Sequence, residues 1–187
     1  MPLDGCYRLA NMAHDGALFT SKTWFGARDY AVGLSTVDKE GADGQPVACE
    51  GKWRWLLNRQ SDGTYKIASA QVAGSHGELI GGALFASRQA LSGGEGYHVG
   101  LSPEDKEEEE GNTGKFRWRL LLESGDDVYK IENVGGAGVL VCTGAEFNSA
   151  GDLQVGCRPP ALDGDGDWAS MRWRLYMQEA LPAGAGI

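Results

Sequence analysis

The sequence predicts an all-β protein built from three similar units, and a repeated segment centred on tryptophan is the main reason. Apolar and basic residues alternate around Trp55, Trp118 and Trp173, which recur about 60 residues apart. Alternation with a period of two is typical of a strand with one buried and one exposed face. The tryptophans fall on the expected buried face and the arginines on the other. The 29 glycines lie mostly between short apolar runs, which favours tight turns.

Three further strand types precede each tryptophan strand, in the same order in every unit. The first has a tyrosine two residues before an aliphatic residue, as in 5–9; the second is an apolar run, as in 17–21. The third is an apolar run around a glycine, as in 30–35. Gly, Asp and Ser turns separate these runs, which indicates strands and not helices. The expected strands are 5–9, 17–21, 30–35, 51–57, 63–67, 83–87, 97–102, 114–122, 127–131, 139–143, 153–158 and 171–175.

This threefold order resembles the β-trefoil superfamily across essentially the whole chain. The resemblance implies one domain over residues 1–187, with repeats at about 5–60, 63–123 and 127–179 and a flexible tail at 180–187. First and fourth strands would form a six-stranded barrel, and second and third strands would form three hairpins that cap it; closure removes sheet edges. A generic β-sandwich is the alternative. The residues expected to fill the barrel are Tyr7, Leu9, Trp53, Trp55, Tyr65, Ile67, Phe116, Trp118, Tyr129, Ile131, Met171 and Trp173.

Charge and hydropathy narrow the classes of partner and the compartment. The net charge of −9 favours solubility and disfavours duplex nucleic acid as a partner. No apolar run approaches the ~20 residues of a transmembrane helix. The N-terminal residues show neither a basic nor an apolar signal region, so we expect no secretory signal and a cytoplasmic or non-classically exported protein. Four cysteines are too few for a disulfide scaffold, and we expect them reduced.

A functional resemblance is to the ricin-B-like lectins. The segments Trp118–Leu120, Tyr129–Asn133 and Gly138–Leu140, with Gly125 between them, are similar to the core of such a lectin repeat. That family places a glutamine two residues before the tryptophan, an aspartate after the strand-two leucine and a sugar-stacking aromatic after strand three. The signature is absent in all three units. The corresponding residues are Trp53, Phe116 and Met171, then Phe19, Phe85 and Val141, then Ser35, Ser102 and Arg158.

A sugar site requires an aromatic face with fixed polar groups beside it. Trp24 has no counterpart in the other units, which makes it a candidate to stack on a ligand whose hydroxyls Asp15, Arg28 and Asp29 would bind. The alternative, favoured because large aromatic side chains are usually buried, is that Trp24 and Phe25 fold back and plug the barrel end. Trp168, beside two aspartates, is a second candidate for the ligand site.

Basic residues concentrate in the barrel strands of this acidic chain. They predict a basic outer wall, which either is neutralised by loop carboxylates or docks an anionic partner. The wall residues are Arg8, Arg54, Lys66, Arg117, Lys130 and Arg172.

Catalysis, metal binding and cofactors find little support. The run 163–167 alternates aspartate and glycine, but position twelve is Arg174 and not the glutamate of a calcium loop. The three histidines do not have the spacing of metal ligands, and the sequence contains no motif of a catalytic nucleophile. We therefore expect no metal, no cofactor and no enzymatic activity.

Cys142 and Cys157 lie in neighbouring strands of the third unit. Ricin-B-like lectins often join these strands by a disulfide, although the family's cysteine lies just before the strand-two leucine and Cys142 lies two residues after Leu140. Both positions are of core type, which favours two buried thiols over a bridge.

The sequence leaves three functions open. The first is a non-enzymatic, lectin-like module that binds a carbohydrate through loops, and the second is an interaction or structural subunit of a larger complex. The third is a protease inhibitor, because the segment 53–67 is similar to that of the mycocypin family, which implies inhibition by loop insertion.

Overall fold

The computed structural model describes residues 3–25, 29–36, 53–69, 82–91, 95–103, 106, 109, 112, 114–123, 127–160 and 168–179. Within them the chain forms twelve strands and one short 3-10 helix, η2, at Trp168–Met171. The strands are β1 Gly5–Asn11, β2 Gly16–Phe25, β3 Asp29–Ser35, β4 Trp55–Arg59, β5 Tyr65–Ser69, β6 Gly82–Ala90, β7 Tyr97–Ser102, β8 Trp118–Leu122, β9 Val128–Asn133, β10 Gly138–Glu146, β11 Leu153–Arg158 and β12 Arg172–Glu179.

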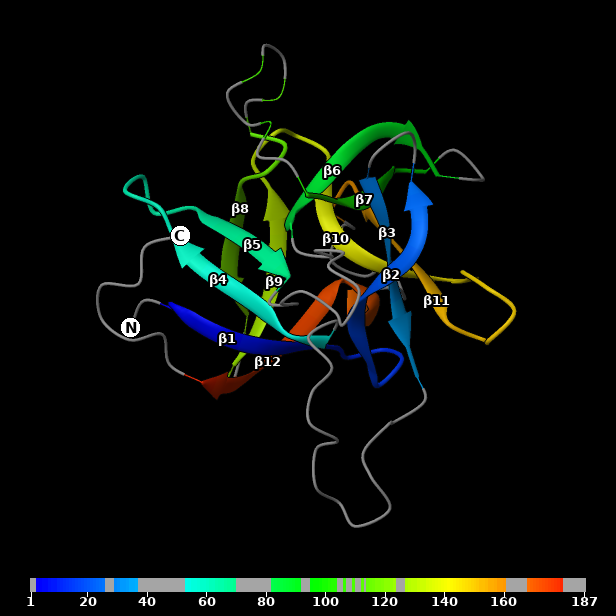
Figure 1. The fold of residues 1–187 in the computed structure, drawn as a ribbon. Helices are drawn as coiled ribbons and strands as arrows, with labels where there is room; N and C mark the ends of the chain where they lie inside the picture. Colours follow the sequence, from blue (N-terminus) through cyan, green and yellow to red (C-terminus); the bar gives the residue numbers. More distant parts are fainter. Residues whose placement is uncertain are drawn as a thin grey trace, which may run out of the picture.

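Six strands close into an antiparallel barrel. The pairings run β1–β4, β4–β5, β5–β8, β8–β9, β9–β12 and back from β12 to β1. These are the first and fourth strands of each unit, as the sequence predicted, and Figure 1 shows them gathered on the left of the view. The closed ring leaves none of these strands as a free sheet edge along its paired length.

The remaining six strands form three hairpins, β2–β3, β6–β7 and β10–β11, on one end of the barrel. Their third strands pair with one another in a triangle, β3–β7, β7–β11 and β11–β3. In Figure 1 the hairpins lie to the right of the barrel. The fold is therefore a β-trefoil.

The tryptophans of β4, β8 and β12, the fourth strands of the three units, meet in one core. Trp55, Trp118 and Trp173 are fully buried, and each indole Nε1 donates to the carbonyl of a strand-two leucine at 2.9–3.0 Å. A buried indole N–H needs such an acceptor. The sequence-predicted barrel residues Tyr7, Leu9, Tyr65, Ile67 and Ile131 join this cluster, while Tyr129 packs against it half-buried.

Three residues expected inside the barrel do not join this core. Trp53, Phe116 and Met171 lie in turns or 3-10 segments before their strands, which begin at Trp55, Trp118 and Arg172. The expected fourth strands therefore began too early. The three side chains pack instead on the strand-two residue outside the central cluster, because a turn removes them from the inward alternation of the strand.

Each hairpin bulges at the same place in its first strand, which is β2, β6 or β10. The register shifts between Thr20 and Trp24, between Ala86 and Ala90, and between Cys142 and Glu146. At each bulge a hydroxyl accepts the backbone N–H two residues on, from Thr23 to Ser21, from Gln89 to Ser87 and from Ala145 to Thr143. The sequence therefore repeats the bulge through a Ser or Thr at the same point.

Cys142 and Cys157 are both buried, and no disulfide joins them. Their cross-strand partners are Val155 and Leu140, so the two cysteines do not face each other. Burial raises the pKa of the Cys157 thiol. The expectation of two core thiols is confirmed for this pair.

The described part of the chain contains no helix long and apolar enough to cross a membrane. The expected tail at 180–187 and the aspartate-rich run at 163–167 lie outside the described residues.

Candidate functional site

The first sequence-predicted site is divided between the two ends of one hairpin. The backbone of Trp24 pairs with Tyr30, and Asp29 pairs with Phe25 at the hairpin tip. Asp15 is exposed and has a φ of 48°, and it lies in the turn before Gly16. The ten residues of β2 therefore separate it from Asp29. The structure does not bring these two carboxylates together. The side chain of Trp24 and all of Arg28 lie outside the described residues.

Asp29 has a local partner. Its Oδ1 lies 3.6 Å from Lys106 Nζ, and the aspartate is half-buried. The pair joins the tip of the first hairpin to the segment that follows β7.

Trp168, the second candidate, is covered on one side by a cation. Trp168 is the first residue of η2 and is 48% exposed. The guanidinium carbon of Arg172 lies 3.7 Å from the centroid of its indole ring. A cation at this distance is held by the π face, so that face is not open to a sugar. The neighbouring aspartates lie outside the described residues.

The expected basic wall is half-buried at all six positions, and an acid neutralises part of it. Glu123, just after β8, bonds Arg172 Nη2 at 2.9 Å and Lys130 Nζ at 3.2 Å. Partial burial raises the pKa of Glu123, but the hydrogen bonds from Lys130 and Arg172 outweigh it and leave that pKa below its ordinary value. This supports the neutralised alternative for that part of the wall.

The positions of the lectin signature are occupied by apolar contacts. Phe19 packs on Trp53 with ring centroids 5.1 Å apart, and Phe85 packs on Phe116 at 5.4 Å. In the third unit Val141 and Met171 share a small buried cluster. The aspartate and glutamine implied by the resemblance are thus replaced, in every unit, by two apolar side chains that bury each other.

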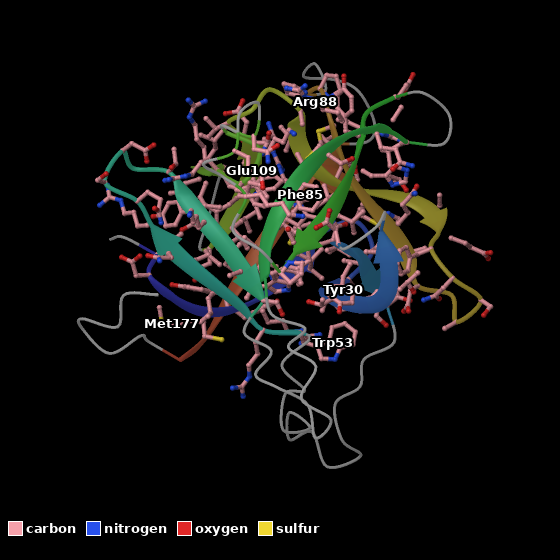
Figure 2. All side chains as sticks on the ribbon, turned by 45° about the horizontal axis from the view of Figure 1, so that its top comes forward. Tyr30, Trp53, Phe85, Arg88, Glu109 and Met177 are labelled. Carbon is pink, nitrogen blue, oxygen red and sulfur yellow. The ribbon has the colours of Figure 1, made fainter. Side chains whose placement is uncertain are left out.

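A cleft of ≈ 280 Å³ lies at the junction of the second and third units. We call it the Tyr97 cleft. Its volume is near the lower end of ligand pockets, which are about 300–1,000 Å³, so it suits a small ligand. Figure 2 shows Arg88 of β6 at the upper edge of the molecule, far from Met177 of β12. The lining residues are Ala86, Ser87, Arg88, Tyr97, Lys115, Asn133, Gly135, Gly136 and Ala137.

Asn133 is the most constrained polar residue of the cleft. It is 3% exposed, and its Nδ2 donates to the carbonyls of Gly114, Lys115 and Arg117 at 2.9–3.2 Å. These contacts fix the amide orientation, because only the NH₂ group can donate. Its Oδ1 is therefore a fixed acceptor, and it has no hydrogen-bond partner in the described part of the chain.

Its counterpart in the first unit is satisfied. Asn11 Nδ2 donates to Ser170 O at 2.7 Å, and Asn11 Oδ1 accepts from Ala13 N at 3.1 Å. In the third unit the amide at the place of Ala13 is Gly135 N, which donates to Gly114 O at 3.0 Å instead. The backbone has turned away from Asn133 Oδ1. A buried acceptor without a donor is costly, so Asn133 Oδ1 is an unsatisfied polar atom within the described part of the chain.

A glycine keeps the cleft open. Gly136, with φ 83, has nothing within 4 Å of where a Cβ would be. Its counterpart between the third and first units is His14, whose ring lies 3.8 Å from the Cβ position of Gly144, the counterpart of Arg88. There a histidine occupies the space that Gly136 leaves free. The cleft therefore arises from a departure from threefold symmetry.

Sequence reasoning missed this cleft because it searched for tryptophans. Tyr97 is 39% exposed, whereas its counterparts Tyr30 and Leu153 are half-buried against the core. An alignment of the three units shows glycine at 136 where the first unit has His14, and this difference was the available signal.

Comparison with known proteins identifies the fold and no family. No family model matches the chain, and no curated protein matches it in sequence. Among solved structures, an SDF2-like protein from Arabidopsis thaliana has a TM-score of 0.65 at 12% identity, with 96% of each chain covered.

Two further structures agree on the fold. A salivary protein from Culex quinquefasciatus of the Cysteine and Tryptophan-Rich (CWRC) family has a TM-score of 0.61 at 19% identity, covering 94% of each chain. The designed threefold-symmetric protein ThreeFoil has a TM-score of 0.58 at 20% identity, covering 92% of this chain and 98% of its own. At these identities the likeness shows a β-trefoil and nothing about ligands.

Proposed function

We propose that this chain is a non-enzymatic, lectin-like binding module that recognises a carbohydrate in the Tyr97 cleft at its hairpin-capped end. The observation that carries the proposal is the exposed Tyr97 in a cleft that Asn133 also lines; the buried Oδ1 of Asn133 has no hydrogen-bond partner in the part of the chain that the structure describes. Sugars match this pair, because their C–H faces stack on aromatic rings and their hydroxyls donate hydrogen bonds.

The lining of the cleft favours binding over catalysis. Its described residues include no carboxylate, histidine or cysteine. Glycoside hydrolysis ordinarily needs two carboxyl groups on opposite sides of the bond, and acyl transfer needs an activated nucleophile. Ser87 has another role, since its hydroxyl accepts the Gln89 amide at the bulge.

A glycan array with purified, labelled protein tests the proposal. Wild type should bind a defined set of glycans, and Tyr97→Ala should lose that binding. Tyr176→Ala is the matched control, because Tyr176 is 43% exposed but lies on β12 of the barrel. A folded wild type that binds no glycan, or a Tyr97→Ala variant that binds like wild type, would contradict the proposal.

An interaction subunit is a second candidate, and the barrel strands carry an observation in its favour. Leu121 and Leu122 of β8 are exposed, and so are their counterparts Tyr176 and Met177 of β12. The two pairs are separate, because β9 lies between β8 and β12. Exposed apolar residues that lie together can mark protein contacts. If either pair is used, Leu122→Glu with Met177→Glu should abolish co-purification of a partner while glycan binding is retained.

The protease-inhibitor alternative depends on long loops of the second unit. Most of those loops, 70–81 and 104–111, lie outside the described residues. A papain inhibition assay addresses it directly, and we expect no inhibition.

A further inference from the structure

We propose that Lys115 is the residue of the Tyr97 cleft that donates a hydrogen bond to the ligand, and that Asn112 is the positioning residue that holds Lys115 in place. This inference rests on the proposed function and names two residues that act in it. Lys115 and Tyr97 both line the cleft, and Lys115 and Asn112 are half-buried. Three observations carry the inference: the contacts of the Lys115 backbone, the bond of its ammonium, and the turns that orient Asn112.

The backbone of Lys115 is fixed to two other residues of the cleft lining. Its carbonyl oxygen accepts from the amide of Ala86 at 3.1 Å and from Nδ2 of Asn133 at 2.9 Å. Its own amide donates to the carbonyl of Asn112 at 3.0 Å. The position from which the Lys115 side chain starts is therefore set by β6, by the end of β9 and by the segment before β8.

The ammonium of Lys115 is held by a neutral group. Its Nζ donates to Asn112 Oδ1 at 2.6 Å, and this is the one side-chain hydrogen bond that Lys115 makes within the described residues. An ammonium has three N–H groups, so two donors remain for a ligand. The amide oxygen has no net charge, so it orients the ammonium without forming an ion pair.

Two other lysines in the described part of the chain contact carboxylates instead. Lys130 Nζ lies 3.2 Å from Glu123 Oε1, and Lys106 Nζ lies 3.6 Å from Asp29 Oδ1. Their counter-charge is supplied within the protein. Hydrogen bonds from a charged donor are stronger than those from a neutral one, so the ammonium of Lys115 suits a hydroxyl oxygen of a sugar.

Asn112 is itself held by a run of linked turns. Backbone hydrogen bonds join residues three apart, from Glu109 N to Lys106 O at 3.2 Å and from Asn112 N to Glu109 O at 3.0 Å. The Nδ2 of Asn112 donates to Lys106 O at 2.9 Å and to Glu109 Oε2 at 3.3 Å. Because only the NH₂ group of the amide can donate, these bonds fix its orientation and leave Oδ1 to accept from Lys115.

A lysine that is already held favours binding. A long side chain loses rotamer freedom when a ligand immobilises it, and this loss lowers affinity. The bond to Asn112 removes part of that freedom in the free protein. We therefore expect Asn112 to contribute to affinity through Lys115 and not by contact with the ligand.

A double-mutant cycle tests the inference, with affinities measured by isothermal titration calorimetry. The probes are the methyl glycosides of glucose, galactose, mannose and N-acetylglucosamine, together with any glycan that the protein binds on the array. Lys115→Met should weaken binding about tenfold, because a hydrogen bond from a charged donor is lost. Asn112→Ala should weaken binding about three- to fivefold in the wild-type background and less than about twofold in the Lys115→Met background.

Two control variants lie outside the cleft lining. Asn148→Ala removes an amide that bonds Asp152 at 2.9 Å in the turn between β10 and β11. Arg119→Met removes an exposed cation from β8. Neither control should change the affinity, and thermal unfolding verifies that each variant is folded.

Each outcome has a defined meaning. If Lys115→Met binds the probe like wild type, Lys115 is not the donor and the inference is wrong, while carbohydrate binding stands. If Asn112→Ala weakens binding equally in both backgrounds, Asn112 does not act through Lys115 and its positioning role is wrong. If the folded wild type binds none of the probes and no glycan on the array, the proposed function fails together with this inference.

Discussion

The indole Nε1 of Trp118 donates a 3.0 Å hydrogen bond to the backbone carbonyl of Leu84, 34 residues earlier in the chain. The same bond joins Trp55 to Leu18 and Trp173 to Leu140. Each bond connects a barrel strand to the hairpin strand of its own unit. The three bonds therefore hold the cap, and the Tyr97 cleft on it, at a fixed position on the barrel.

Replacing one of these indoles should lower stability strongly. Trp118→Phe leaves the Leu84 carbonyl without its donor in the core and opens a small cavity. We therefore expect the free energy of unfolding to fall by at least about 1 kcal/mol and by as much as about 3 kcal/mol. Urea denaturation measures it. Trp168→Phe, at a half-exposed indole, should change stability by less than about 0.5 kcal/mol. Equal effects of the two variants would contradict the role given to the buried bond.

The glycine that opens β10 is required by a close approach of backbone. A Cβ at Gly138 would lie 2.0 Å from the carbonyl oxygen of Arg158, whereas one at Gly151 would meet nothing within 4 Å. Both residues have positive φ, 99 and 79, so both alanine variants share that strain. We expect Gly138→Ala to cost at least about 2 kcal/mol more than Gly151→Ala. Similar unfolding midpoints for the two variants would contradict the contact.

Glu123 should stabilise the barrel only while it is ionised. Its folded pKa lies below the ordinary value, so its contribution is full above the unfolded pKa and is lost as pH falls through the folded pKa. At pH 7 we expect Glu123→Gln to cost about 1–2 kcal/mol, and the difference from wild type should shrink below about pH 4.

The comparison for Glu123 is a more exposed pair. Arg119 and Glu132 lie 3.3 Å apart on the barrel surface, and the Arg119 side chain is 54% exposed. Glu132→Gln should therefore cost less than about 0.5 kcal/mol at any pH. Chemical unfolding at several pH values measures both variants, and a pH-independent effect of Glu123→Gln would contradict the ion pairs.

The two thiols of the third unit should remain reduced and protected. Burial raises the pKa of Cys157, and its strand neighbour is Leu140, so a thiol reagent should label it only as the protein unfolds. Peptide mapping of alkylated native protein measures this. A peptide pair bridged by Cys142 and Cys157 under non-reducing conditions would contradict it.

Much of the fold could be predicted from the sequence because each unit repeats the same local physics. Alternation around Trp55, Trp118 and Trp173 set the inward face of the barrel, and the recurring strand order set the topology. The residues two positions before each tryptophan were placed wrongly. Their apolar character fitted an inward strand position, but the turn that removes them from the strand depends on contacts with β2, β6 and β10.

The candidate site was less predictable because it depends on differences between units and not on the repeat. Trp24 and Asp15 are close in sequence. In the structure, however, Asp15 precedes the ten-residue strand β2, which separates it from the hairpin tip. The Tyr97 cleft needs Gly136 where another unit has His14, and it needs the amide of Gly135 to turn away from Asn133. Such contacts exist only once the units are assembled.

The most direct test of the central claim is an NMR titration of the folded protein with the saccharide that binds best. The side-chain amide of Asn133 and the backbone amides of 135–137 should shift in a saturable way. The indole N–H signal of Trp168 and the backbone amide signal of Tyr176 should not shift. Saturable shifts confined to the barrel wall, or a cleft that stays silent while the saccharide binds, would show that the Tyr97 cleft is not the binding site.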